Sequence, residues 1–331
     1  MGATRRARFR AAVGVLSLVA LALPAGAQEA PAGFQRYFPR GHIPTLDAPQ
    51  YVPAKKAHVP NDAWVLGVVV EGQALAYELN LLTRNEVIND RVGGRPVAVV
   101  YCPLANSVAV YDRRVGGREL HFEPSGVLMN GAIVIQDRET ESYWPLLHGR
   151  ALFGPLLGAG LQTIPGATKS RWEDWVREHP DTLVWSLFGQ QRLDANPMAR
   201  YLASSTGFRG MAATDERLPT KEPVFGFERA GRRWAAAASL LERGRAFAIG
   251  EEWVLLLRPA KAALNDVTRA FVSRAGFVRD GESWIEKGSG ARLDAARTTF
   301  VGPGAPEPIE GFDTFWYVWS LTFPDTALLG G

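Results

Sequence analysis

The sequence is poor in the residues that form covalent cross-links and metal centres. It contains one cysteine, Cys102, so no disulfide can form within the chain. Its five histidines are scattered and show no ligand spacing, whereas structural zinc sites require clustered Cys and His side chains. The sequence therefore predicts no metal site, no cofactor, and a fold that is stabilised without oxidative cross-links.

Motifs of well-characterised catalytic sites are also absent. The chain has no H-E-x-x-H zinc motif, no G-x-S-x-G nucleophile turn, no phosphate-binding G-x-x-x-x-G-K loop and no calcium-binding EF-hand loop. The motifs therefore leave open whether the protein is an enzyme.

No apolar run is long enough to cross a membrane as a helix. The run at residues 11–23 spans 13 residues, whereas a spanning helix needs about 20. Four arginines precede it and Ala25-Gly26-Ala27 follows it, which is the order of a secretory signal peptide and its cleavage site. We therefore expect a signal peptide at residues 1–27, a periplasmic or secreted location, and no membrane span after cleavage. The export route, Sec or twin-arginine, stays open.

The mature chain has little net charge. The whole chain carries +3, and residues 1–27 contain four arginines and no acidic residue, so removing those four charges from +3 leaves −1. A surface that binds a polyanion needs clustered basic residues in excess. Nucleic acid is therefore a poor candidate partner.

The most informative positive feature is internal similarity. Val65-Leu66-Gly67-Val68 matches Val224-Phe225-Gly226-Phe227, and tryptophan pairs recur in the same order further along the chain. We interpret this pattern as two diverged copies of one unit. The interpretation divides the chain into the signal peptide (1–27), a proline-rich extended arm (28–60), a first β-rich copy (61–190), a linker (191–218) and a second, degenerate copy (219–331).

The strand pattern predicts antiparallel hairpins. Gly93-Gly94 and Gly116-Gly117 each separate two β-rich runs, and glycine accepts the positive φ that tight hairpins require. We therefore expect two successive hairpins in the first copy, and hence a meander. The runs concerned are residues 86–92 with 96–101, and residues 107–112 with 119–122.

A helix is expected at the end of each copy, over residues 168–178 and 313–322. Each contains two tryptophans three positions apart, Trp172 with Trp175 and Trp316 with Trp319, which places them on one helical face, against the sheet. The expected fold class is α+β, mostly antiparallel β, with two diverged copies of a β-meander unit, each closed by a C-terminal helix.

Candidate site residues gather at the strand ends of the first copy. A carboxylate near a thiol, with amide and hydroxyl donors close by, is typical of a small-ligand pocket. The corresponding stretch of the second copy, residues 242–261, lacks these elements. The candidate ligand-binding residues are Asn85, Glu86, Asn89, Asp90, Cys102, Asn106, Asp112, Arg113 and Trp144.

The same residues also have a purely structural explanation. Asn and Asp are favoured in turns because their side chains bond the local backbone, and a lone Cys is commonly a small core residue. Both explanations stay open from the sequence.

A series of short motifs runs in order through the first copy. They are Glu86-Val87-Ile88-Asn89-Asp90, Gly94-x-Pro96-Val97, Tyr101-Cys102-Pro103-Leu104, Asp112-Arg113, Ser125-Gly126, Asp137-Arg138, Ser142-x-Trp144, Gly154-Pro155-Leu156 and His179-Pro180-Asp181-Thr182. With these motifs, residues 65–186 resemble a secreted bacterial family known only as domain of unknown function 3179. The resemblance implies a degenerate second copy and carries no established activity.

The chain departs from this family at two positions. Family members usually have His-Glu where this chain has Asn85-Glu86, and Cys-Pro-Leu-Cys where it has Cys102-Pro103-Leu104-Ala105. A C-x-x-C pair supports thiol exchange or binds a soft metal. The resemblance therefore implies a diverged member without the family's His and second Cys.

Three functions remain open. The leading hypothesis is an exported small-ligand-binding or accessory protein with its pocket in the first copy. The second is an enzyme that uses Cys102, with Glu86 as a possible catalytic partner, as a nucleophile or in thiol exchange. The third is a purely structural interaction module. The identity of the ligand or partner, the oligomeric state and the pathway are not determined by the sequence.

Overall fold

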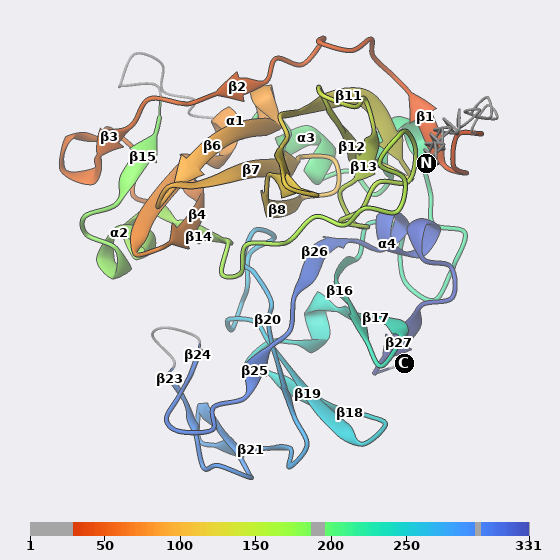
Figure 1. Cartoon of the computed structure of the whole chain (residues 1–331). Helices are drawn as coiled ribbons and strands as arrows, with labels where there is room; N and C mark the ends of the chain where they lie inside the picture. Colours follow the sequence, from red (N-terminus) through yellow and green to blue (C-terminus); the bar gives the residue numbers. More distant parts are fainter. Residues whose placement is uncertain (1–28, 187–195, 295–298, 331) are drawn as a thin grey trace, which may run out of the picture.

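The computed structural model describes residues 29–186, 196–294 and 299–330. Most strand pairings in these residues are antiparallel, and the helices are few and short. The expected fold class, mostly antiparallel β with a minor helical part, is confirmed. We call residues 61–186 the first unit and residues 219–330 the second unit; Figure 1 shows the first above the second.

The first unit begins with a β-hairpin, and later strands of the chain pair with both of its outer edges. In the hairpin sheet the strand order is β14-β4-β5-β15-β3. β14 runs antiparallel to β4, and β15 runs parallel to β5. The strands are β3 (Val52–Pro53), β4 (Trp64–Val70), β5 (Gln73–Glu78), β14 (Thr168–Arg171) and β15 (Leu183–Trp185).

A three-stranded meander follows, as the first Gly-Gly pair predicts. Gly93 and Gly94 both have positive φ and turn β6 into β7, which then pairs with β8. The second Gly-Gly hairpin is shorter than expected. It joins only β9 to β10, because the chain then enters another sheet as β11. The strands are β2 (Leu46–Asp47), β6 (Val87–Val92), β7 (Arg95–Cys102), β8 (Ser107–Asp112), β9 (Arg114–Val115) and β10 (Arg118–Glu119).

The third sheet of the first unit has the order β1-β11-β12-β13. The arm contributes β1 to this sheet, β2 to the meander and β3 to the hairpin sheet, so its described part lies along three sheets (Figure 1). The strands are β1 (Phe34–Arg36), β11 (Phe122–Met129), β12 (Ala132–Asp137) and β13 (Tyr143–Pro145).

The second unit also holds three sheets. Their strand orders are β26-β16-β17-β27, β18-β19-β20-β25 and β21-β22-β23-β24. The first of these repeats the directions of the hairpin sheet above, with β26 antiparallel to β16 and β27 parallel to β17. The strands are β16 (Pro223–Arg229), β17 (Arg232–Ala237), β18 (Arg245–Ile249), β19 (Glu252–Leu257), β20 (Arg269–Ser273), β21 (Phe277–Asp280), β22 (Ser283–Glu286), β23 (Arg292–Asp294), β24 (Thr299–Val301), β25 (Glu307–Pro308), β26 (Gly311–Phe315) and β27 (Ala327–Leu329).

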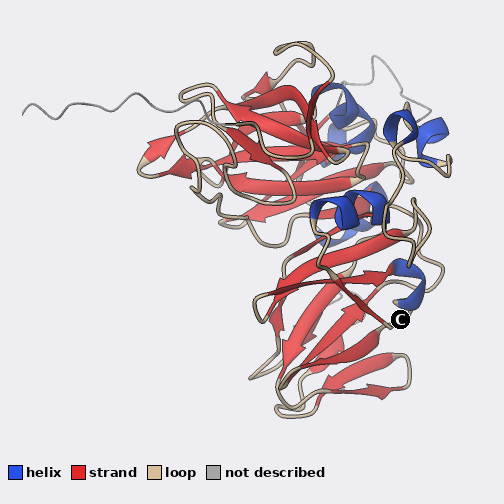
Figure 2. Cartoon of the chain, turned by 90° about the vertical axis from the view of Figure 1, so that its right-hand side faces the viewer, coloured by secondary structure: helices blue, strands red, loops and turns tan. Residues whose placement is uncertain are grey.

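The helices are short and gather along one side and at the junction of the units (Figure 2). The two expected terminal helices exist but begin later than predicted, at Trp172 and Trp316, because the residues before them pair as β14 and β26. None of the described helices has the length and apolar character needed to cross a membrane. The helices are α1 (Leu79–Asn85), α2 (Trp172–Glu178), α3 (Ala199–Leu202) and α4 (Trp316–Thr322), with 3-10 turns η1 (Ala54–Lys56), η2 (Phe208–Gly210) and η3 (Ala238–Leu240).

One hydrophobic core is shared by both units. Trp316, Tyr317 and Trp319 of α4 pack in the same cluster as Cys102 and Trp144 of the first unit. Burial of such large aromatic side chains removes much apolar surface from water. The relative position of the two units is therefore fixed by core packing.

Candidate functional site

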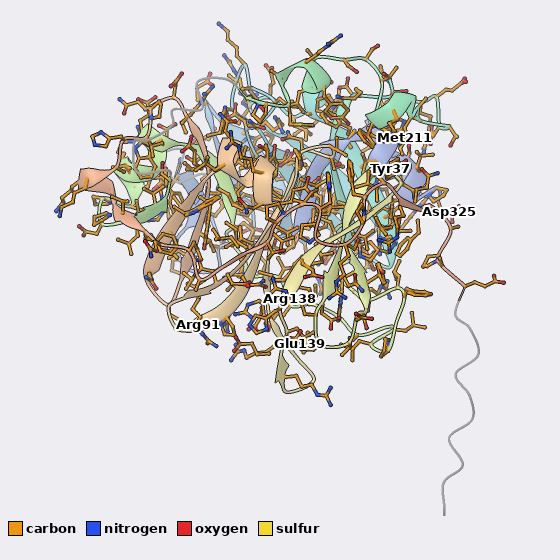
Figure 3. All side chains as sticks on the ribbon, turned by 90° about the horizontal axis from the view of Figure 1, so that it is seen from above. Tyr37, Arg91, Arg138, Glu139, Met211 and Asp325 are labelled. Atoms are coloured by element: carbon orange, nitrogen blue, oxygen red, sulfur yellow. The ribbon has the colours of Figure 1, made fainter. Side chains whose placement is uncertain are left out.

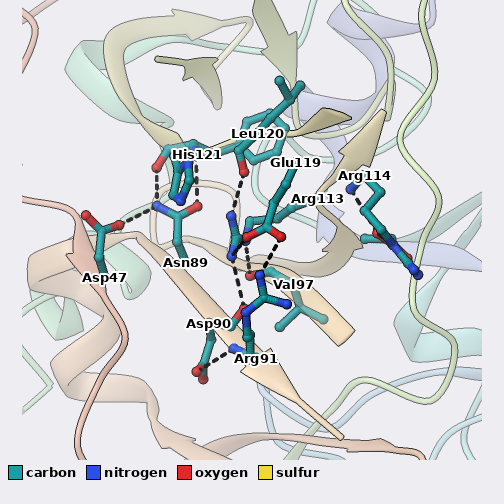
Figure 4. Close-up of polar contacts among 12 residues, drawn as sticks. Asp47, Asn89, Asp90, Arg91, Val97, Arg113, Arg114, Glu119, Leu120 and His121 are labelled. Carbon is teal, nitrogen blue, oxygen red and sulfur yellow. Dashed lines mark hydrogen bonds and ion pairs between the residues drawn. The ribbon is translucent and has the colours of Figure 1, made fainter. Parts of the chain in front are cut away.

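Asn89 joins three segments of the first unit. Its Nδ2 donates to Asp47 Oδ1 (2.7 Å) and to the Phe122 carbonyl oxygen (2.8 Å), and its Oδ1 accepts from the Phe122 backbone N–H (2.9 Å). Figure 4 shows these bonds linking β6 to the arm and to β11. The side-chain amide is buried, and both its nitrogen and its oxygen have hydrogen-bond partners. Buried polar groups in stable structures are generally hydrogen-bonded in this way.

Asp90 and Arg113 form the centre of the same buried network (Figure 4). Asp90 accepts from the hydroxyls of Tyr51 and Tyr77. The Arg113 guanidinium is buried, donates to the carbonyl oxygens of Val97, Leu120 and Asp90, and pairs with the Glu119 carboxylate at 2.9 Å. A buried guanidinium is costly unless its donors are satisfied. This arrangement stabilises the strand ends.

The polar groups of Asp112 and Trp144 also have partners within the protein. The Asp112 carboxylate pairs with Arg114 at 2.5 Å, and hydrogen bonds from this arginine lower the pKa of the carboxyl group. The Trp144 indole N–H donates to Asp137 at 2.9 Å, and its ring packs edge-on against Phe122.

Polar side chains continue outward from this network to one edge of the molecule. In the view of Figure 3, Arg91, Arg138 and Glu139 lie on the same side of the molecule, away from Tyr37 and Met211. Arg138 pairs with Asp47, and Arg91 with Glu119. These partly exposed pairs tie the network to the surface.

Cys102 lies in the shared core. The residue is 1% exposed, and its sulfur accepts a hydrogen bond from the Ile133 backbone N–H (3.3 Å). Burial, with the nearby Glu86 carboxyl group, raises the pKa of the thiol to about 12. The nucleophilic form of cysteine is the thiolate, so this environment disfavours nucleophilic chemistry at neutral pH.

Glu86 lies close enough to Cys102 for its charge to raise the pKa of the thiol. It follows α1 with a positive φ of 59°. The residue is partly exposed, but burial of its carboxyl group raises the pKa to about 8. The preceding residue, Asn85, donates from its side-chain amide to the Pro44 carbonyl oxygen at 3.0 Å.

Asn106 leads from this region to the second unit. It has a positive φ of 53°, and its Nδ2 donates to the Leu264 carbonyl oxygen at 3.4 Å. Its own carbonyl oxygen accepts a hydrogen bond from Lys169 Nζ at 2.8 Å. Its buried Oδ1 has no hydrogen-bond partner in the described residues.

The nine candidate residues thus do not meet at one pocket. Arg113 bonds the Asp90 carbonyl oxygen, Asn89 bonds Asp47 and Phe122, Asp112 pairs with Arg114, and Glu86 lies near Cys102. That they bind a ligand stays a prediction.

A cavity of about 770 Å³ lies between the two units. Its lining does not include the nine candidate residues. β8 and residues 163–169 form its wall on the first unit, and β16, β20 and β26 contribute the opposite wall. This volume is typical of a small-molecule site. Its apolar lining includes Ile164, Phe227, Phe271, Ile309 and Trp319.

Several charged groups of the cavity wall already have partners. Asp313 accepts from Arg258 (3.0 Å) and from the Thr268 hydroxyl (2.6 Å), and Arg233 pairs with Glu228 (2.6 Å). These contacts leave the wall with two cations and one acid that have no ion-pair partner in the described residues: Lys169, Arg269 and Glu310.

Lys169 is the most unusual group in this wall. The residue is 3% exposed, and in the described part of the chain its ammonium has one hydrogen-bond acceptor, the Asn106 carbonyl oxygen. Burial lowers the pKa of Lys169 to about 8. No sequence pattern singles it out, because residues 168–171 have the polar pattern of a solvated segment and fall within the helix expected at residues 168–178.

His148 lines the same cavity. Its Nδ1 is buried without a hydrogen-bond partner in the described residues, and burial lowers the pKa of the imidazole to about 4. The ring is therefore neutral at physiological pH and offers a basic nitrogen.

Metal-ligand geometry is not found in the described residues: no three side chains of the types His, Cys, Asp and Glu gather closely enough to hold an ion.

Comparison with known proteins gave one match. The sequence model of a family described as a protein of unknown function (DUF3179) matches residues 40–326, which includes both units. No curated protein and no solved structure matches the chain.

Proposed function

The chain belongs to the DUF3179 family of proteins of unknown function, and we propose that its function is to bind a small amphipathic organic acid in the cavity between the two units. The observation that carries this proposal is Lys169, a buried cation in the cavity wall with one acceptor among the described residues. Burying an ammonium group is costly unless it gains partners. A bound oxygen anion supplies the missing ones.

The remaining charges favour an anion over a cation. Arg269 donates one hydrogen bond to the Thr168 hydroxyl (3.0 Å), and burial raises the pKa of Glu310, the acid of this wall without an ion-pair partner in the described residues, although the Arg269 charge lowers it. A carboxylate therefore meets two cations without an ion-pair partner in the described part of the chain. The aromatic and aliphatic wall suits an apolar body of several carbon atoms.

Isothermal titration with octanoate tests the proposal, with octylamine as the control that has the same tail and the opposite charge. We expect saturable binding of octanoate alone. Lys169→Met should weaken it about tenfold or more, since a hydrogen bond to a charged group contributes about 1.5–3 kcal/mol. Ala167→Trp, which fills the cavity from a half-buried position, should abolish it.

Equal binding of octanoate and octylamine, or octanoate binding that survives Ala167→Trp, would contradict the proposal. Circular dichroism of both variants checks that the fold is retained.

Catalysis by Cys102 has less support than ligand binding. The thiol is buried and poorly ionised, and the cavity does not include it. No observation in the described residues singles out a partner protein.

Export is part of the proposal. The basic head, the apolar run and Ala25-Gly26-Ala27 support a signal peptide at residues 1–27 and a periplasmic or secreted location. These residues lie outside the described part of the chain.

We also propose that the two units are diverged copies of one ancestor. The proposal is supported by the matched sequence motifs and by the shared order and directions of β14-β4-β5-β15 and β26-β16-β17-β27. Binding residues from both units would then converge at their junction.

A further inference from the structure

We propose that Lys169 is a nucleophile, which condenses with an aldehyde or ketone carbonyl of the ligand to form an imine inside the cavity. This inference rests on the proposed function, because it requires that the cavity admits a small organic molecule.

The contacts of Lys169 do little to hold it in the ammonium form. Nζ forms no ion pair in the described residues, and its hydrogen bond goes to an uncharged acceptor, the Asn106 carbonyl oxygen. The Asp313 carboxylate, one of the acids of the same wall, is already bonded by Arg258 and Thr268. The ammonium form is therefore not held in place by a carboxylate contact, whereas the neutral amine keeps its hydrogen bond.

Burial of Lys169 also increases the fraction of the side chain that is a neutral amine. With its pKa lowered to about 8, about a quarter of Lys169 is neutral at pH 7.5, against about one part in a thousand for an exposed lysine. Desolvation in an apolar pocket is a recognised way to activate a lysine for imine formation.

The reaction needs no oxidant or reductant. The Nζ lone pair attacks the carbonyl carbon, and the carbonyl oxygen takes a proton to give a carbinolamine. Loss of that oxygen as water, with the second amine proton, leaves a C=N bond between Nζ and the ligand. His148, a neutral imidazole, lines the same cavity, and imidazole is the side chain that most often transfers protons in such steps.

The surrounding wall favours the condensed product. Ile164, Phe227 and Phe271 line the cavity, and an apolar enclosure limits the water that would hydrolyse the imine.

Lys221 provides a matched comparison within the chain. Burial lowers its pKa to about 8 as well, but it lies under Tyr201 and Phe315, away from the cavity wall. A reaction governed by basicity alone would label both lysines, whereas a reaction in the cavity labels Lys169.

The experiment is reductive trapping with octanal and cyanoborohydride at pH 7.5 on the mature protein, followed by peptide mapping. We expect Lys169 to be labelled at least about tenfold faster than the exposed Lys55, Lys56 and Lys287, given its larger neutral fraction. Excess octanoate should protect Lys169 but not Lys221. Ala167→Trp should remove labelling at Lys169, and Lys169→Arg should leave the cavity unlabelled.

The two proposals fail separately. If octanoate binds but Lys169 is labelled no faster than the exposed lysines, the imine proposal is overturned and ligand binding stands. If Lys169 is labelled equally with and without octanoate, the reaction does not occur in the cavity, and the imine proposal is again overturned. If octanoate does not bind, the proposed function fails first.

Discussion

The indole ring of Trp175 lies directly against the backbone of Gly67: a Cβ atom at Gly67 would stand 2.3 Å from Cζ3 of the ring. The same relationship recurs in the second unit, where a Cβ at Gly226 would stand 2.4 Å from the ring of Trp319. Each indole N–H also donates to a threonine seven residues later, Thr182 or Thr326. Each hairpin strand therefore needs a glycine where the terminal helix packs on it.

Gly67→Ala and Gly226→Ala should each destabilise the protein by about 1–3 kcal/mol, the usual cost of overpacking a core. Denaturant unfolding measures this. Gly160→Ala is the control, because a Cβ there meets nothing within 4 Å. Stability equal to that of the control would contradict the close packing.

The Cys102 thiol should be inert in the folded protein. It is buried and its pKa is raised to about 12, so little thiolate exists at pH 8. An aromatic disulfide reagent should react with about one thiol per chain in denaturant and with almost none without it. Rapid reaction of the native protein would restore Cys102 as a candidate nucleophile.

Glu86 should make stability fall as pH rises. Its carboxyl pKa is raised from 4.5 to about 8 by burial, so the folded state binds the proton more tightly than the unfolded state. The contribution is fully present below pH 4.5 and is lost as pH approaches 8, with a slope of at most about 1.4 kcal/mol per pH unit. Urea unfolding at several pH values measures this. The free energy of unfolding should depend less on pH in Glu86→Gln than in the wild type, and as in the wild type in the exposed Glu71→Gln.

Lys169→Met should stabilise the protein at neutral pH while it weakens octanoate binding. The lysine pKa is lowered from 10.5 to about 8, so the charged form costs stability below pH 8, and this cost disappears as pH rises to 10.5. We expect a gain of about 1–3 kcal/mol at pH 7, after allowance for the lost hydrogen bond to Asn106. The exposed Lys287→Met should change neither property. A large destabilisation would mean that Lys169 serves the fold and not a ligand.

The secreted or periplasmic protein should begin at Gln28. The small residues Ala25 and Ala27 predict cleavage after Ala27. Mass spectrometry of the mature N-terminus measures this, and an intact Met1 in a membrane fraction would contradict it.

The strand pattern and the two tryptophan pairs could be predicted from the sequence because they depend on local rules: alternation along a strand, positive φ at Gly93 and Gly94, and i, i+3 spacing on a helix. The same rules extended the helices too far. Residues 168–171 and 311–315 are strands because β4 and β16 offer them backbone partners, and tertiary pairing outweighs local preference.

The candidate site shows the same division. The sequence identified Asn89, Asp90 and Arg113 as polar residues at strand ends. Glu86 lies near Cys102 because it directly precedes β6, which pairs with β7, the strand that ends at Cys102. Only the tertiary structure decided the partners of the strand-end residues: Asn89 bonds Asp47 and the Phe122 backbone, and Arg113 bonds the Asp90 carbonyl oxygen. Lys169 and Arg269 lie a hundred positions apart in the sequence, and only the packing of the two units places them in the wall of one cavity. A cavity forms where two surfaces meet, and no local sequence pattern shows which surfaces will do so.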